Sequence, residues 1–163
     1  DRIGVMDKGH LVQVASPREL YEAPNSRWIA GFVGDINLIE GRVTAIHREF
    51  DRVTIATAEA GLIVAARTQV VGAGDNVCVA IRPEKIALTR ADEEAAIAIN
   101  SLAGELVEIG YLGSLSSYRV RLDTGAVLRV VQPNASRLAD NRFAAGQRIV
   151  VSFLPDDAVV LDQ

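Results

Sequence analysis

The spacing of hydrophobic and polar residues changes near residue 35 of this chain. Before that point, apolar residues over 3–6 and 10–14 flank Asp7-Lys8-Gly9, which predicts a β-hairpin with a short glycine-containing loop. After it, short alternating runs separated by turn residues predict strands, and no strong helical period occurs. We therefore place a domain boundary at Asp35, with residues 1–35 before it and a mainly β domain over 36–163.

Two short helices are predicted between the hairpin and this boundary. The stretch 16–19 reads Ser-Pro-Arg-Glu, a capping box with proline at the first helical position. Pro24 ends this helix, and Asn25 is expected to cap the next one. Trp28 and Phe32 stand four residues apart in the second helix, as do Ile29 and Val33, so we expect one apolar stripe that ends at Gly34, with Trp28 as a core anchor.

The domain that follows repeats itself. The matched blocks are 37–43 with 100–106, and 74–84 with 146–156. We therefore expect two related β units in tandem, over about 37–91 and 100–162. Each unit opens with a strand at an asparagine and closes with a strand that ends at a proline, which donates no ladder hydrogen bond. The acidic run 92–94 between the units is expected to be a solvated linker.

One strand of the first unit has a large-residue face and a small-residue face. Val77, Val79 and Ile81 alternate with Cys78 and Ala80. No basic residue stands near Cys78 in sequence, so we interpret this cysteine as a small buried residue and not as a nucleophile.

The second unit contains a hairpin over 118–131 whose register can be deduced. A three-residue loop at Asp123-Thr124-Gly125 pairs Val120 with Leu128 and keeps one face apolar. A two-residue loop would set Val120 against Arg129. We therefore predict the three-residue loop.

This register places like charges against each other on the outer face. Arg119 lies opposite Arg129, with Arg121 beside them, and directly opposed like charges are destabilising unless something compensates. Neighbouring carboxylates such as Glu105 or Glu108 would compensate. The alternative is an anion or an acidic partner surface.

Composition narrows the range of functions. The 163 residues carry 17 Lys and Arg against 21 Asp and Glu, a net charge of −4, and only 5% are aromatic. This balance argues against nucleic acid as a partner. One cysteine excludes a disulfide framework, and two isolated histidines disfavour zinc. The sequence has no P-loop, nucleophile elbow or suitably spaced carboxylate pair, so we predict no catalytic, cofactor or metal site.

Two turn-like motifs remain as candidates for contacts. Arg82-Pro83-Glu84-Lys85 places opposite charges around a rigid turn, which favours a structural corner, with a subunit contact as the alternative. Gly110-Tyr111-Leu112-Gly113 lets the backbone approach a partner or simply turn. The candidate interface or anion contacts are Arg82, Glu84, Tyr111, Arg119, Arg121 and Arg129.

These motifs, in their order and spacing, resemble the C-terminal part of the ATP-binding subunit of an ABC importer. The parts similar to the end of its nucleotide-binding domain are 1–9, Gln13, 17–21, Pro24 and 32–34. Those similar to its regulatory domain, called the TOBE domain, are 37–41, 81–84, 111–113 and 160–161. The stretches 82–86 and 111–122 look most similar to the polyamine branch, which imports putrescine or spermidine. Iron(III) and sugar importers share much of the pattern.

The resemblance implies an OB-like β-barrel of two TOBE-type repeats, with a regulatory and dimerisation role and no catalysis of its own. It implies a parent ATPase that uses ATP and Mg, pairs with a second copy and docks on permease subunits at the cytoplasmic face of the inner membrane. The barrel would keep the two ATPases close together when their ATP-dependent interface opens. The alternative reading is a small-ligand or oxyanion-sensing module of an iron(III) or sugar importer ATPase.

Overall fold

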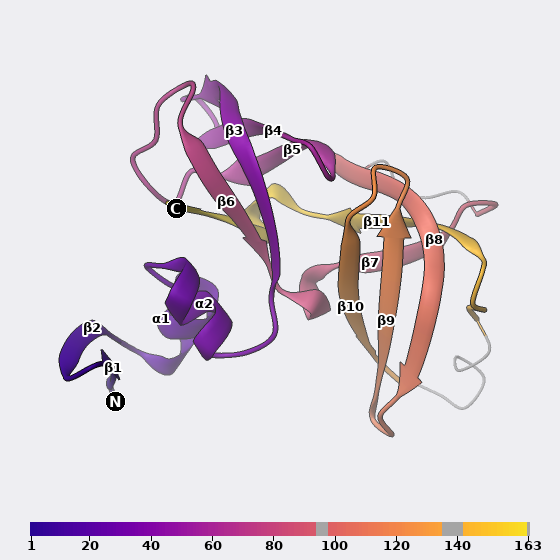
Figure 1. The fold of residues 1–163 in the computed structure, drawn as a ribbon, viewed down its shortest axis with the longest axis horizontal. Helices are drawn as coiled ribbons and strands as arrows, with labels where there is room; N and C mark the ends of the chain where they lie inside the picture. The colour runs from indigo at the N-terminus through magenta and orange to yellow at the C-terminus, as the bar shows by residue number, and fades with distance from the viewer. Residues whose placement is uncertain (94–97, 135–141, 163) are drawn as a thin grey trace.

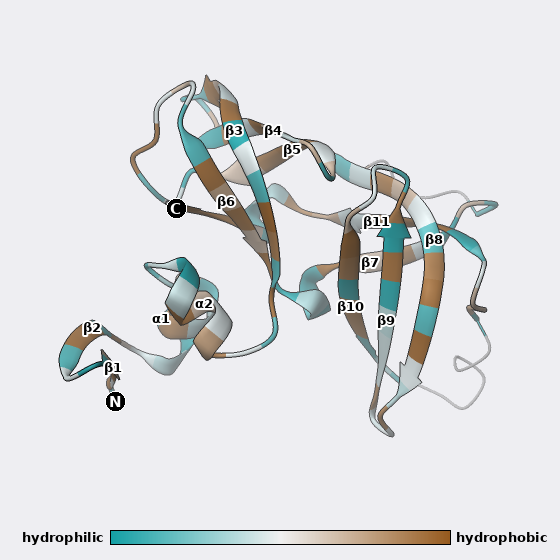
Figure 2. Cartoon of the chain, viewed as in Figure 1, coloured by the Kyte–Doolittle hydropathy of each residue, from teal (hydrophilic) through white to brown (hydrophobic). Residues whose placement is uncertain are grey.

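The computed structural model describes residues 1–93, 98–134 and 142–162 of the chain. It contains an N-terminal unit, a closed five-stranded barrel and a second, curved five-stranded sheet (Figure 1). Hydrophilic and hydrophobic positions alternate along strands of both sheets (Figure 2). The predicted mainly β, OB-like fold, with two related units, an N-terminal hairpin and short helices, is confirmed.

The N-terminal unit is a hairpin followed by two short helices. Its elements are β1 (Ile3–Asp7), β2 (His10–Ala15), α1 (Pro17–Glu22) and α2 (Arg27–Phe32). Lys8 and Gly9 form the turn of the hairpin, and both have positive φ, at 47° and 83°. The capping box of α1 is confirmed, because the Glu19 N–H donates to Ser16 Oγ at 3.3 Å and the Ser16 N–H donates to Glu19 Oε2 at 2.8 Å.

Two predictions for α2 are wrong. Ser26, and not Asn25, caps this helix by accepting the Ile29 N–H at 3.4 Å. Trp28 is not a core anchor, since it is 43% exposed and stacks on the exposed Phe32 at 5.1 Å between ring centroids. The helix buries Ile29, which belongs to the predicted stripe, and Ala30, which does not. Helical spacing identified apolar positions on α2 but did not determine which of them meet the rest of the protein.

The closed barrel contains strands from both ends of the domain. Its order is β12 (Ala158–Asp162), β5 (Gly61–Ala66), β4 (Arg52–Thr57), β3 (Asn37–His47) and β6 (Asn76–Ile81). On β6, Val77, Val79 and Ile81 belong to the main core, while Cys78 and Ala80 pack with Ala30 of α2. Cys78 is buried as predicted, and burial raises the pKa of its thiol.

The second sheet confirms the predicted hairpin register. Its order is β10 (Val127–Pro133), β9 (Leu115–Leu122), β8 (Asn100–Tyr111), β11 (Arg148–Phe153) and β7 (Ala87–Arg90). Val120 lies opposite Leu128, and Arg119 lies opposite Arg129. The apolar faces of this sheet and of the barrel contribute to one hydrophobic core.

The two sheets exchange their last strands. β7 is the last strand of the first unit in sequence but pairs with β11 of the second. β12 is the last strand of the second unit but pairs with β6 and β5 of the first (Figure 1). The sequence repeat therefore corresponds to two spatial units that each include one strand from the other.

Equivalent elements recur where the two units meet. Two 3-10 turns, η1 (Pro83–Lys85) and η3 (Pro155–Asp157), lie 72 residues apart and contact β10 and β5, respectively. We call them the first and second corner. Asn37 and Asn100, 63 residues apart, each bond through the side chain to backbone groups of the other unit.

The asparagine contacts match each other closely. Asn37 accepts the Arg129 N–H at 2.8 Å and donates to the Arg129 carbonyl at 2.8 Å. Asn100 does the same with the Val64 N–H and carbonyl, both at 2.8 Å. We call these two contacts the asparagine bridges. Buried side-chain amides in proteins nearly always have hydrogen-bond partners. Each bridge therefore holds the two units in a defined position relative to each other.

The acidic run is exposed where it is described. Asp92 pairs with Arg90 at 2.8 Å, and Glu93 pairs with Arg142 at 2.9 Å. Glu94, the third residue of the predicted linker, lies outside the described residues.

Candidate functional site

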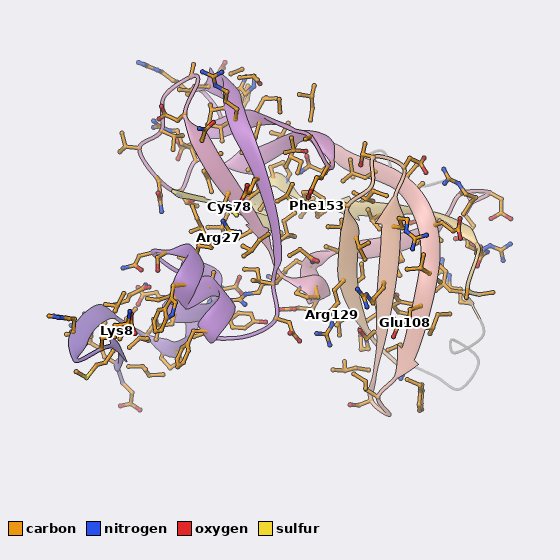
Figure 3. All side chains as sticks on the ribbon, in the orientation of Figure 1. Lys8, Arg27, Cys78, Glu108, Arg129 and Phe153 are labelled. Carbon is orange, nitrogen blue, oxygen red and sulfur yellow. The ribbon has the colours of Figure 1, made fainter. Side chains whose placement is uncertain are left out.

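The predicted arginine pair lies in a groove of about 450 Å³ on the outer face of β8, β9 and β10. Glu108, Arg119 and Arg129 form one row across these strands, and Figure 3 shows Glu108 and Arg129 on this sheet. The groove is lined by Ile36, Asn37, Glu108, Gly110, Ser117, Arg119, Val127 and Arg129. We call it the charged groove.

Carboxylates at both ends of the row balance its two arginines. Arg119 Nη1 lies 3.5 Å from Glu108 Oε2, as one prediction expected, and Arg129 Nη1 lies 2.7 Å from Asp35 Oδ2. Arg129 Nε also donates to Ser117 Oγ at 3.3 Å. The row therefore runs negative, positive, positive, negative, and an incoming anion would compete with groups of the protein itself.

Arg121 and Tyr111 lie away from this row. Arg121 is exposed on β9 between Glu105 and Val127 of the neighbouring strands. Tyr111 is exposed at the end of β8, beside the exposed Leu112 at the tip of the β8–β9 hairpin. The structure thus brings together Arg119 and Arg129 but not these two candidates, and their predicted role in an interface stays a prediction.

Arg82 is buried at the first corner, with 5% of its surface exposed. Its Nη1 donates to the carbonyls of Ala30, Gly34 and Asp35 at 3.0, 3.2 and 3.2 Å, and its Nη2 donates to the Tyr21 carbonyl at 3.1 Å. Carbonyls at the C-terminal ends of helices lack partners within the helix. Arg82 therefore satisfies such groups at α1 and α2 and attaches both helices to the barrel.

Tyr21 and Glu84 extend this contact. The Arg82 guanidinium carbon lies 4.1 Å from the Tyr21 ring centroid, and the Tyr21 hydroxyl donates to Glu84 Oε1 at 2.5 Å. Burial and then the bond to Glu84 raise the pKa of Tyr21 to about 12. We call Arg82, Tyr21 and Glu84 the corner lock. The motif 82–85 forms a structural corner as predicted, and a further contact of Arg82 or Glu84 with a partner stays a prediction.

A second groove, of about 410 Å³, occupies the equivalent place beside the second corner. Two of its lining residues have counterparts in the charged groove at the repeat offset of 63 residues: Ile99 corresponds to Ile36, and His47 to Gly110. Val64 is bound by Asn100 in the way that Arg129 is bound by Asn37. The groove is lined by His47, Phe50, Arg52, Val64, Ile99, Leu154, Pro155 and Asp156. We call it the apolar groove.

Sequence reasoning missed the apolar groove, although the repeat contained a signal for it. Leu154 lies 72 residues from Arg82 and precedes Pro155 as Arg82 precedes Pro83. Arg82 is buried under the helices, whereas Leu154 is 61% exposed. The leucine at this position was therefore a signal in the sequence that the second corner differs from the first.

The described residues offer neither a membrane span nor a metal cluster. Within residues 1–93, 98–134 and 142–162, no helix is long and apolar enough to cross a bilayer. The same residues contain no group of three or more His, Cys, Asp or Glu side chains placed to hold a metal ion.

The fold and its repeated units define the class of this protein. The chain belongs to the TOBE domain family, whose model matches residues 79–161. Similarity to spermidine/putrescine import ATP-binding proteins extends further along the chain and confirms the resemblance to ATP-binding subunits of polyamine ABC importers.

Two curated relatives illustrate this similarity. The spermidine/putrescine import ATP-binding protein PotA of Trichormus variabilis is 37% identical over 136 residues, which cover 82% of this chain and 35% of the relative. The putrescine transport ATP-binding protein PotG of Escherichia coli K12 is 36% identical over 166 residues, which cover 98% of this chain and 42% of the relative. The chain thus spans about two fifths or less of the length of these relatives.

A solved structure shares the fold. The cytoplasmic molybdate-binding protein ModG, crystallised with molybdate bound, superposes with a TM-score of 0.68 over 78% of this chain and 96% of its own. The two sequences are 16% identical, so the likeness concerns the fold alone.

Proposed function

We propose that this chain is the non-catalytic regulatory and dimerisation module of the ATP-binding subunit of an ABC importer for polyamines such as putrescine or spermidine. The relatives are import ATP-binding proteins for these solutes, which supports both the parent activity and the substrate class. ATP and Mg would act on a nucleotide-binding domain outside this chain. The partners would be a second copy of the subunit and permease subunits at the cytoplasmic face of the inner membrane.

The corner lock is the observation that carries this proposal. Residues 1–35 resemble the end of a nucleotide-binding domain, and Arg82 holds their two helices by four hydrogen bonds. A domain attached through buried, charge-assisted bonds moves together with its neighbour. The barrel can therefore follow the ATPase during opening and closing, and a barrel-to-barrel contact can limit how far two ATPases separate.

The experiment compares the intact subunit with a version that ends at Asp35 in this numbering. Sedimentation velocity measures the dimer fraction in ATP, with hydrolysis blocked, and then in ADP. We expect both proteins to dimerise with ATP, and only the intact subunit to remain dimeric with ADP. Equal dimer fractions in ADP would overturn the dimerisation role. Uptake of labelled putrescine by vesicles that contain the permease tests the substrate class separately.

The charged groove favours a second candidate function, oxyanion or small-ligand sensing. Two arginines and Ser117 line a space of about 450 Å³, and the protein that shares the fold binds molybdate. Calorimetry of the chain with molybdate, sulfate, putrescine and spermidine tests this candidate. Stoichiometric anion binding that Arg129→Gln abolishes would favour the sensor, whereas the absence of heat with all four would reject it.

A further inference from the structure

We propose that the apolar groove is a self-docking surface, on which the apolar groove of a second copy packs around a twofold axis. The inference rests on the dimerisation role proposed above and names the surface that performs it. None of the groove's residues is among the interface candidates that the sequence suggested.

Large apolar side chains gather at this groove. Phe50, Ile99 and Leu154 line it and are exposed, and the exposed Leu62 lies two residues from Val64 along the same face of β5. Exposed apolar side chains that gather at one groove are typical of interaction sites on protein surfaces. A twofold interface also needs projecting groups and a hollow on the same surface. Phe50 is 68% exposed and lines the same groove as Val64 and Leu154, so this surface offers both an exposed ring and a hollow.

The charges at the rim suit a second copy of this chain. Arg52 Nη2 lies 2.7 Å from Asp156 Oδ1, and Arg67 Nε lies 3.0 Å from Asp51 Oδ1 at the neighbouring strand ends. Because both signs flank the apolar centre, the surface does not repel its own copy. In a twofold pair, Arg52 of each copy would face Asp156 of the other.

Comparison with the first corner supports the same occupant. There, α1 and α2 cover the corner through the corner lock, whereas Leu154 and Ile99 are exposed at the second corner. The charged groove is less suited to self-docking, because its paired charges would have to lose water on association. Among the residues that line the apolar groove, the charged pair is Arg52 with Asp156, and most of the others are apolar. The contact there need not be strong, since paired ATPases would hold two barrels at an effective concentration of about 1 mM.

Sedimentation equilibrium of the 163-residue chain, at concentrations up to about 1 mM, tests the proposal at the concentration that tethering would provide. We expect a reversible dimer whose dissociation constant rises at least about tenfold in Leu154→Glu, because a buried hot spot would gain an unpaired charge. Leu112→Glu is the matched control, since Leu112 is also 61% exposed but lies at the tip of the β8–β9 hairpin. This variant should dimerise like the original chain, and thermal unfolding should confirm that both variants fold.

Charge exchange gives a sharper test. Arg52→Asp and Asp156→Arg should each weaken self-association, because each breaks the contact across the twofold axis. A mixture of the two variants should associate again, because each copy then offers the sign that the other lacks. The ion pair within each chain stays broken in the mixture, so recovery there could not arise from restored folding.

Each outcome has a distinct meaning. A wild-type chain that remains monomeric up to about 1 mM overturns the self-docking surface, as does a dimer that is unaffected by Leu154→Glu. A dimer weakened by Leu112→Glu alone would place the interface at the hairpin tip and also overturn it. The ADP experiment on the intact subunit decides the dimerisation role independently of all three results.

Discussion

The two corners of the domain have the same backbone form and different uses. Each is a 3-10 turn that starts at a proline, after the final strand of a repeated block, and each contacts a strand of the other unit. At the first corner the preceding residue is the buried Arg82, which holds two helices. At the second it is the exposed Leu154. One side chain at an equivalent position thus distinguishes an attachment point within the chain from an open surface.

The two grooves extend this comparison. The same kind of asparagine bridge supports both, but Arg129 occupies the bridged position in one and Val64 in the other. The backbone framework is therefore duplicated, while the side chains on it give one groove paired charges and the other an apolar lining. Variants at matched positions can separate the contribution of the framework from that of the side chains.

The largest effect on the free energy of unfolding is expected when the first corner receives the leucine of the second. Arg82→Leu removes four hydrogen bonds to carbonyls, and we expect a loss of about 3 kcal/mol or more in the free energy of unfolding, because buried acceptors lose their partners. The reciprocal variant Leu154→Arg should change stability by at most about 0.5 kcal/mol, since the side chain is already exposed. Urea unfolding measures both. Similar losses of unfolding free energy in Arg82→Leu and Leu154→Arg would contradict the conclusion that only the first corner attaches other elements.

The asparagine bridges should behave alike. Asn37→Ala and Asn100→Ala each leave a backbone N–H and carbonyl of the other unit without this partner, so we expect each to cost about 2 kcal/mol. Chemical denaturation of the two variants under the same conditions checks this. A loss confined to one bridge would show that the two units do not depend on their junctions equally.

Tyr21→Phe tests one bond of the corner lock and keeps the ring over Arg82. We expect a loss of about 1 kcal/mol near pH 8, because the hydroxyl no longer donates to Glu84. The pKa of Tyr21 is raised from 10 to about 12 by burial and by Glu84, so folding favours the protonated phenol.

The pH dependence of this bond has a definite sign. Its stabilisation is fully present below pH 10 and is lost as the pH rises toward 12. The difference in unfolding free energy between the original chain and Tyr21→Phe should therefore shrink over this interval. A difference that stays constant from pH 8 to the upper end of the interval would show that the phenol bond is not its source.

The smallest effect is expected in the charged groove. Asp35→Asn leaves Arg129 facing Arg119 with one carboxylate fewer, and the exposure of the pair limits the expected loss to about 0.5 kcal/mol at low salt. The loss should vanish near 1 M NaCl, where charges are screened over about 3 Å. Urea titrations at the two salt concentrations measure it. A loss of equal size in high salt would assign Asp35 a role other than charge balance.

Local pattern was sufficient for the elements whose neighbours are close in sequence. The register of β9 and β10 followed from keeping Val120 and Leu128 on one face, and the capping box at 16–19 predicted the start of α1. The repeat likewise predicted equivalent strands. In each case the relevant interaction spans few residues or recurs twice, so the sequence alone constrains it.

Contacts between segments that are far apart in the chain could not be predicted from the local pattern of residues. Nothing near Arg129 in sequence points to Asp35 as its partner. The motif at 82–85 predicted a structural corner, but arginine is rarely buried, so nothing in it indicated that Arg82 lies under two helices. Trp28 was assigned to the core because its spacing is helical, but which face of α2 is buried depends on β6. The exchange of β7 and β12 depends in the same way on pairing between segments far apart in the chain.

The exchange of final strands also sets an order for folding during synthesis. The barrel strands β3 to β6 emerge from the ribosome well before residues 158–162, which pair with β5 and β6. Until those residues appear, the nascent barrel has open strand edges that other chains could join. A stalled or clipped polypeptide that lacks this last segment would thus be prone to aggregate, even though every other part of the barrel is present.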